Sequence, residues 1–209
     1  MERRDNYRTQ ARNAKRYFLG YDQELLIRKL GLRADDRYLY VEMLCKLHRI
    51  HRETGDIQKQ EGEAWVTADS HAEVMTLLDL VCDSREDRHI SGRWKQMQAF
   101  GLMFHQNLLE DGVDAFAELL GRDPQEAVRA GKALGGVPMQ GGDISYALEL
   151  FDGLRVWMQF WAGDEEFPAR IRWLWDENAL MYLKYETMYF AVGLLRQRIR
   201  ELMSRNAAG

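Results

Sequence analysis

The chain has few cysteines, few prolines and no long apolar run, and each shortage excludes a class of protein. Only 2 of the 209 residues are cysteine, Cys45 and Cys82, and no CxxC pair occurs. A disulfide scaffold, a zinc knuckle or an iron–sulfur cluster held by this chain alone needs more thiolates. With 3 prolines and 17 glycines the chain is neither collagen-like nor proline-rich. No window approaches the roughly 18 uncharged apolar residues of a spanning helix, so no membrane contact is expected.

Several motifs that carry known chemistry are also absent. The sequence has no GxGxxG and no GxxxxGK[ST], so a P-loop nucleotide site is excluded. It lacks the Gly-x-Ser-x-Gly elbow of the usual hydrolases and the HExxH of zinc proteases. The basic N-terminal stretch is not followed by an apolar core, so no secretory signal is recognised and a cytoplasmic location is expected.

The composition is that of a globular protein with an uneven distribution of charge. Hydrophobic residues make up 46% and charged residues 30%, which excludes disorder of the whole chain. The net charge is −4, but residues 1–20 carry +4 and residues 196–205 carry +3, which leaves −11 for the remainder. An acidic body repels phosphates, so no nucleic acid is expected as a partner. The basic ends are expected to face the acidic body of their own fold.

The N-terminal third predicts two helices followed by strands. Residues 1–19 form a basic N-terminal helix with a thin apolar stripe, and residues 22–31 form a second helix that Asp22 caps and Gly31 ends. Residues 38–60 fit a helix or strands. We predict strands, because the polar stretch around Gly55 suits a hairpin turn and the preceding apolar residues alternate: Leu39, Val41, Met43, Cys45 and Leu47.

Further elements follow from capping and turn signals. Ser70 and Glu73 form a capping box at the start of a helix, and residues 93–100 alternate weakly, as in an edge strand. Helices are predicted near residues 105–120 and 124–134, the second with Asp123 as its cap.

The strongest pattern is a three-stranded meander over residues 143–176. Two alternating runs flank Asp152-Gly153, a dipeptide typical of tight hairpins, and residues 170–175 form the third strand. A helix over about 185–203 closes the chain. Because helices and antiparallel strands come in blocks, we predict one α+β domain over residues 1–209. In this domain an antiparallel sheet, made of a hairpin and the meander, is covered by helices.

Motifs in the meander and beyond it resemble a known family. These motifs are Gly142-Asp143, Phe160-Trp161-Ala162-Gly163-Asp164-Glu165-Glu166-Phe167-Pro168, Leu174-Trp175-Asp176, Tyr182-Leu183-Lys184-Tyr185-Glu186 and Ser91-Gly92-Arg93-Trp94. From about Gly20 onward the chain resembles the uncharacterised family catalogued as domain of unknown function 3786. That family occurs in anaerobic bacteria and archaea, and some members are joined to an iron–sulfur domain that brings its own cysteines. The resemblance implies a setting in anaerobic cytoplasmic metabolism near cluster or corrinoid chemistry, and it assigns no catalytic residue.

Two surfaces of the meander are candidate sites. Asp164, Glu166 and Asp176 are the densest carboxylates near a strand end, and such groups can divide acid and base roles or hold a hard cation. The alternative is a polar turn in which Asp164 binds backbone amides and Glu166 pairs with Arg170 or Arg172.

The second surface is the mixed face of residues 154–161. Trp157 and Trp161 share this face with Arg155 and Gln159, opposite a purely aliphatic and aromatic set. It suits either helices of the same fold or a surface left open for a flat ligand or a partner protein. We predict that part of it is not covered by the chain's own helices.

The histidines do not predict a metal site. His48 and His51 have HxxH spacing, but on a strand three residues apart they point to opposite faces. We therefore expect no bound transition metal, and the sequence indicates no particular cofactor.

The residues favour a non-catalytic accessory protein that binds a small molecule or a partner protein on its tryptophan face, and the family resemblance implies that it acts in anaerobic metabolism. The rival hypothesis is a cation-assisted hydrolase built on the three carboxylates. A self-associating subunit, such as a homodimer, would use the same tryptophan face.

Overall fold

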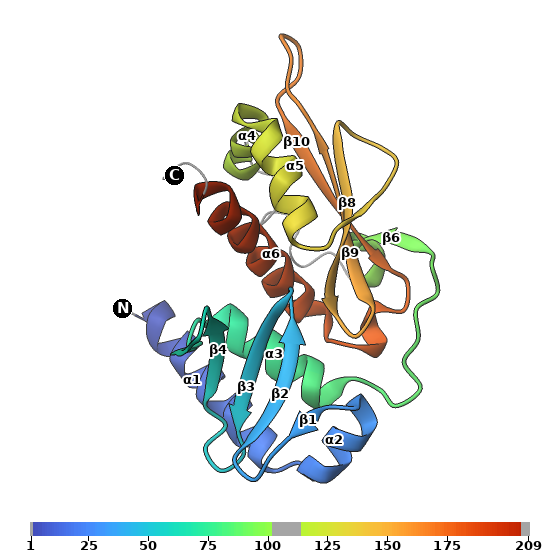
Figure 1. Ribbon diagram of the computed structural model, residues 1–209. Helices are drawn as coiled ribbons and strands as arrows, with labels where there is room; N and C mark the ends of the chain where they lie inside the picture. The colour runs from blue at the N-terminus through green and yellow to red at the C-terminus, as the bar shows by residue number, and fades with distance from the viewer. Residues whose placement is uncertain (1, 102–113, 206–209) are drawn as a thin grey trace. The chain divides into compact units, whose positions relative to one another are not determined.

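The computed structural model describes residues 2–101 and 114–205, and its contacts group the chain into two compact units (Figure 1). Unit 1 comprises Met1–His89 and Leu180–Ala191, and unit 2 comprises Ile90–Ala179 and Val192–Gly209. Each unit has its own five-stranded antiparallel sheet. The predicted α+β class is confirmed, with the strands divided between two sheets. The single domain expected over residues 1–209 stays a prediction. Two compact units form one domain if they unfold together and two domains if each folds alone.

The sheet of unit 1 is an up-and-down meander with the strand order β1-β2-β3-β4-β5. Its inner face is buried and apolar, and α3 covers it while α1 packs along α3 (Figure 1). The elements are α1 (Glu2–Leu19), α2 (Gln23–Leu30), β1 (Arg33–Ala34), β2 (Tyr38–Met43), β3 (Lys46–His51), β4 (Ile57–Glu61), β5 (Ala64–Thr67) and α3 (His71–Asp83).

The predicted strands of residues 38–60 are present, but one of them is interrupted. The alternation through Cys45 predicts a continuous strand, whereas Leu44 and Cys45 form the turn between β2 and β3 with φ of 54° and 53°. Positive φ at both turn positions usually calls for Asn or Gly. Neither residue occurs at this turn, so the turn cannot be predicted from the residue types in the sequence. The second hairpin lies where Gly55 indicated, with Ile50 opposite Ile57.

The helix ends of unit 1 largely follow their sequence signals. The Asp22 side chain accepts a hydrogen bond from the amide of Leu25, and Gly31 ends α2 in the left-handed conformation. Ser70 caps α3 by accepting from the amide of Glu73. A full capping box would also have the Glu73 carboxylate accept a hydrogen bond from the amide of Ser70. This part of the prediction is wrong, because the Glu73 carboxylate contacts His48 and Lys59 instead.

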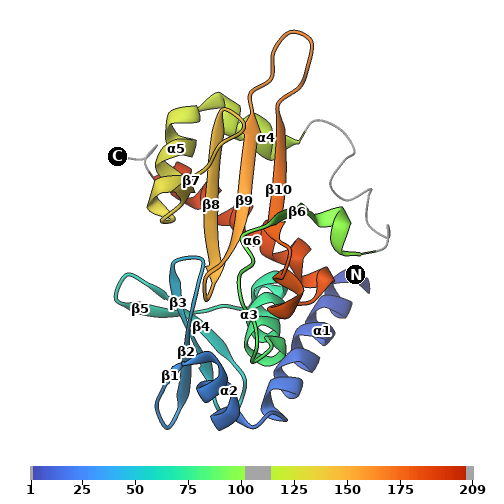
Figure 2. The same ribbon diagram turned by 90° about the vertical axis from the view of Figure 1, so that its right-hand side faces the viewer.

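The sheet of unit 2 has the strand order β6-β10-β9-β8-β7, with α4 and α5 packed on one face (Figure 2). The third helix, α6, contributes Tyr185–Ala191 to unit 1 and its remainder to unit 2. The elements are β6 (Trp94–Gln96), η1 (Met97–Phe100), α4 (Ala115–Arg122), α5 (Pro124–Ala133), β7 (Val137–Pro138), β8 (Ile144–Phe151), β9 (Leu154–Trp161), β10 (Arg170–Asp176) and α6 (Tyr185–Arg205). The short helix η3 (Ala179–Met181) begins with the last residue of this segment, Ala179, and continues into unit 1.

The predicted meander is present as β8, β9 and β10. Asp152 and Gly153 form its first turn with φ of 49° and 79°. The predicted edge strand of residues 93–100 is shorter, because the chain turns into η1 after Gln96. Asp123 caps α5 as expected. The part of the predicted helix at residues 105–113 lies outside the described residues.

Candidate functional site

A mixed aromatic and basic surface lies on β9 and β10, and we call it the tryptophan–arginine face. Its members are Arg155, Trp157 and Trp161 on β9 and Arg170 and Arg172 on β10. Alternation puts them on one side of the sheet, because Arg170 pairs with Trp161 in the strand register. The opposite side of β9, which includes Val156, Met158 and Phe160, is fully buried.

Both indoles of this face are half-buried and are held in place by neighbours. Trp157 Nε1 donates a hydrogen bond to Ser145 Oγ at 2.8 Å, and its ring packs edge-to-face on Trp94 at 5.5 Å. The guanidinium groups of Arg170 and Arg172 lie 4.5 and 5.2 Å from the centroid of the Trp161 ring. A cation over an indole is attracted by the ring's electron density. The Trp161 ring therefore holds the guanidinium groups of Arg170 and Arg172 in fixed positions on this face.

The fourth residue predicted for this face, Gln159, is covered by the chain. It is 7% exposed, and its amide nitrogen lies 3.4 Å from the carbonyl oxygen of Gln140, beneath the segment that carries Gly141. Gln159 Oε1 is buried without a hydrogen-bond partner among the described residues. Arg155 is half-buried, and its guanidinium lies 3.6 Å from the carboxylate of Glu149. Three of the four predicted residues thus share an accessible face, and Gln159 lies underneath.

A cavity of about 250 Å³ adjoins the tryptophan–arginine face at the start of β10. Trp161, Arg170 and Arg172 line it, together with Trp173 and Arg196. Trp173 Nε1 and Arg196 Nε are buried donors without hydrogen-bond partners among the described residues. An unmatched buried donor costs free energy. The lining therefore offers positive charge to acceptor oxygens, and two unpartnered N–H groups lie buried in the same residues.

The three carboxylates of the predicted acidic site are not brought together. Asp164 lies in the loop before β10, where its Oδ1 accepts from the amides of Glu166 and Phe167. These bonds lower the pKa of Asp164. Asp176 ends β10, roughly 20 Å away along the strand. The expected pairing of Glu166 with an arginine is also corrected: among the described residues Glu166 forms no ion pair, and Arg170 and Arg172 lie over the Trp161 ring.

Asp176 has a structural role that explains its motif. It is 1% exposed and accepts hydrogen bonds from the amides of Ser91, Gly92 and Asn178 and from the Ser91 hydroxyl. The adjacent Glu177 forms ion pairs with Arg93 and Lys95. The segment from Ser91 is therefore fastened to the end of β10, which joins two of the sequence motifs.

Sequence reasoning missed a cluster of charged groups in unit 1. Lys184 Nζ lies 3.0 Å from Asp79 Oδ1 and 2.6 Å from Asp83 Oδ2, and Tyr21 donates to Asp83 at 3.1 Å. Burial and the adjacent Asp83 raise the pKa of Asp79. Although burial opposes its charge, the two carboxylates raise the pKa of Lys184. Asp79 also accepts from the amide of Lys184, which anchors the start of α6.

Two sequence signals point to this cluster in retrospect. Asp79 lies inside the apolar run Leu77–Val81, where a buried carboxylate needs a partner. Lys184 belongs to the motif Tyr182–Glu186, which is one of those that resemble the family. A largely apolar cavity of about 420 Å³ adjoins the cluster and is lined by Ala14, Met75 and Leu78 among others.

The histidines lie as the strand register predicts. His48 is buried on the inner face of β3, and His51 lies on the other face. Within residues 2–101 and 114–205, no three His, Cys, Asp or Glu side chains are grouped so that they could hold a metal ion. In the same residues, no helix is long and apolar enough to cross a membrane.

Comparison with known proteins gives one match. The family model described as "Domain of unknown function (DUF3786)" matches residues 22–198, a range that begins after α1. No curated protein matches the chain, and no solved structure matches it.

Proposed function

The chain belongs to the DUF3786 family, and on that premise we propose that it is a non-catalytic accessory protein that binds a small planar anion on its tryptophan–arginine face. We place this role in cytoplasmic anaerobic metabolism, the setting that the family resemblance implies. One observation carries the binding proposal: Arg170 and Arg172 lie on the half-buried indole of Trp161, beside a cavity of about 250 Å³.

The chemistry of the cavity supports an anion with a flat ring. Three guanidinium groups, from Arg170, Arg172 and Arg196, line it, and among the described residues only Arg196 forms an ion pair, with Asp114 at 2.7 Å. The Nε1 of Trp173 and the Nε of Arg196 are buried and have no acceptor among the described residues. Carboxylate, sulfonate or phosphate oxygens match these donors, and a planar ring matches the exposed part of the indole.

The rival hydrolase receives no support from the geometry. Its acidic residues lie at the two ends of β10, and Asp176 is occupied by backbone amides. A cation-assisted reaction needs its carboxylates at one point. We therefore favour binding over catalysis.

Binding is tested with 8-anilinonaphthalene-1-sulfonate, a planar aromatic anion whose fluorescence rises when it leaves water. Trp161→Ala and Arg172→Gln should each raise its Kd about tenfold, because each removes a stacking or charged contact of about 1.4 kcal/mol. The melting temperature should change little, since both side chains are partly or fully exposed. Fluorescence titration measures the first quantity, and circular dichroism measures the second.

A matched control is available in unit 1. Trp65 is also half-buried on a strand, with Arg49 lying 4.3 Å from its ring centroid. Trp65→Ala should leave the Kd within about twofold of the parent. Equal losses from Trp65→Ala and Trp161→Ala would refute a site on the tryptophan–arginine face. The remaining alternative is self-association through this face, which sedimentation velocity tests. If the parent is a dimer and Trp161→Ala is a monomer, the face serves self-association instead of ligand binding.

A further inference from the structure

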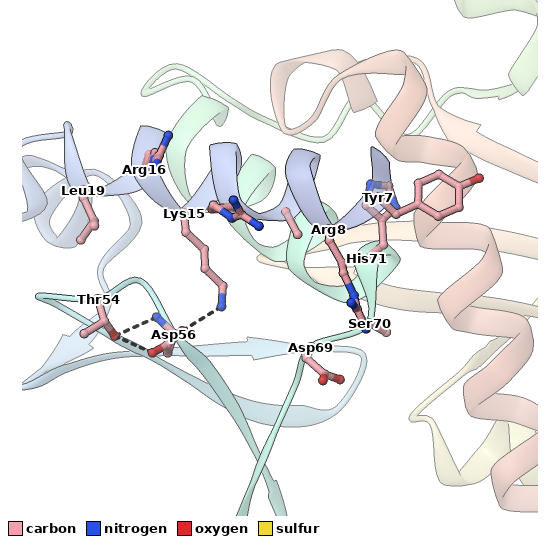
Figure 3. A pocket seen from close by; sticks show the side chains of 12 residues that line it. Tyr7, Arg8, Lys15, Arg16, Leu19, Thr54, Asp56, Asp69, Ser70 and His71 are labelled. Carbon is pink, nitrogen blue, oxygen red and sulfur yellow. Dashed lines mark hydrogen bonds and ion pairs between the residues drawn. The ribbon is translucent and has the colours of Figure 1, made fainter. Parts of the chain in front are cut away.

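A groove of about 900 Å³ lies in unit 1 between α1 and two facing segments (Figure 3). Four cationic residues of α1 line it: Arg8, Arg12, Lys15 and Arg16. The facing segments are the turn between β3 and β4 and the start of α3. This site belongs to unit 1, whereas the tryptophan–arginine face belongs to unit 2.

The cations of α1 form one continuous stripe. Arg8, Arg12, Lys15 and Arg16 recur at spacings of three and four residues, which places them on one side of the helix over about 12 Å. Like charges at these spacings oppose helix formation. Such a stripe is therefore costly to the helix unless something compensates its charge.

Within the described residues, only one of these four cations forms an ion pair with the chain itself. Lys15 Nζ forms an ion pair with Asp56 Oδ1 at 2.8 Å (Figure 3), and this bond lowers the pKa of Asp56. Arg8, Arg12 and Arg16 form no ion pair with any carboxylate whose position is described. Of these four groove cations, Lys15 is therefore the one whose expected neutralisation is seen among the described contacts. The groove keeps an excess of positive charge.

The facing wall is polar and carries both signs of charge. Ser70 and His71 begin α3, whose N-terminus adds partial positive charge, and Figure 3 shows Arg8 reaching toward Ser70. Asp69 is exposed on the same wall. A ligand in this groove would thus meet cations along α1 and a hydroxyl-binding carboxylate opposite them.

One end of the groove offers an aromatic surface. The ring of Tyr7 lies 4.6 Å from that of His71, and Tyr7 remains 46% exposed. His71 is fixed by a hydrogen bond between its Nε2 and Gln10 Oε1 at 2.8 Å and by the edge-on ring of Phe190. A planar ring can stack against this held pair.

We propose that this groove binds a phosphorylated small molecule that carries a flat ring and hydroxyl groups, the class to which nucleotides belong. Arg8 and Arg12 take the phosphates, Asp69 accepts from hydroxyl groups, and Tyr7 contacts the ring. The volume of about 900 Å³ suits a ligand of this size. An extended polyanion such as a nucleic acid fits less well, because the carboxylate of Asp69, which is unpaired among the described residues, would repel phosphates along the facing wall.

The test is isothermal titration of the full chain with ADP, GDP, CDP and UDP at low salt. At least one should bind with a Kd below about 1 mM and lose affinity as salt is added, because the contacts are charged. Arg8→Gln and Arg12→Gln should each weaken binding about tenfold. Both arginines are exposed, so the melting temperature of either variant should match that of the parent.

Matched controls separate this site from general charge effects. Arg28 is exposed on α2 in the same unit but outside the groove, so Arg28→Gln should change the Kd by less than about twofold. Equal losses from Arg28→Gln and Arg12→Gln would overturn the proposal. It would also be overturned if no nucleotide bound, if the corresponding nucleoside bound as tightly as its diphosphate, or if inorganic pyrophosphate bound as tightly as the nucleotide. Trp161→Ala should leave nucleotide binding unchanged, which keeps this test independent of the proposed function.

Discussion

At the scale of single residues, the buried carboxylate of Glu73 in unit 1 is held by two basic side chains. His48 Nε2 lies 3.2 Å from Glu73 Oε1, and Lys59 Nζ lies 3.0 Å from Oε2. The other ring nitrogen of His48 lies 2.9 Å from the carbonyl oxygen of Lys46, so both ring nitrogens face acceptors. Burial alone would raise the pKa of Glu73, but the bonds from His48 and Lys59 outweigh it and lower that pKa.

Glu73→Gln should lower the free energy of unfolding at pH 7 by about 2–3 kcal/mol, because it removes charged hydrogen bonds in a buried place. The sign of the pH dependence follows from the lowered pKa. The contribution of Glu73 is present above its unfolded pKa of about 4.3 and is lost as the pH falls through the lower folded value. Urea unfolding between pH 7 and pH 3 should therefore show a shallower acid loss in the variant.

The control for this measurement is Glu42, an exposed carboxylate on β2 of the same sheet. Glu42→Gln should change stability by less than about 0.5 kcal/mol. If Glu42→Gln and Glu73→Gln gave the same curves, the buried contacts of Glu73 would contribute nothing to stability.

At the scale of elements, the turns show how far the fold could be predicted from the sequence. The Asp152-Gly153 hairpin is recognisable because glycine and aspartate tolerate positive φ. The turn at Leu44 and Cys45 adopts the same kind of backbone without such residues, so pairing of β2 with β3 imposes it. A turn whose own residues favour its backbone conformation can be predicted from the sequence. A turn whose conformation is imposed by the pairing of the flanking strands cannot.

Two glycines give a paired prediction about element stability. Gly153 has φ of +79°, so Gly153→Ala should cost about 1–2 kcal/mol in backbone strain. Gly193 lies within α6, and a Cβ there would meet nothing within 4 Å. Gly193→Ala should therefore stabilise the protein by about 0.5–1 kcal/mol. Chemical denaturation of both variants checks the opposite signs, and a gain from Gly153→Ala would contradict the hairpin geometry.

At the scale of the whole molecule, the sites depend on contacts that local patterns do not carry. Alternation along β9 places Trp157 and Trp161 on one face, but the coverage of Gln159 by the segment at Gln140 requires a pairing of distant residues. Asp79 and Lys184 are 105 residues apart in sequence. Periodicity predicts which face of an element a residue occupies, whereas the partner of that face depends on the packed chain.

The last prediction concerns the cooperativity of the two units. Unit 1 consists of two segments separated by residues 90–179, and its second segment continues into unit 2 within α6. Unfolding of unit 1 would remove the first two turns of a helix that unit 2 also uses, and helices form cooperatively. We therefore expect one unfolding transition, as the single domain predicted from the sequence requires.

Leu77→Ala tests this coupling, because Leu77 is fully buried in unit 1 and its loss should cost about 2–5 kcal/mol. In a Trp65→Phe background all five remaining tryptophans belong to unit 2, so their fluorescence reports on that unit alone. The fluorescence midpoint in urea should fall together with the circular dichroism midpoint. An unchanged fluorescence midpoint beside a biphasic circular dichroism curve would show that unit 1 unfolds alone, and the single-domain prediction would then be wrong.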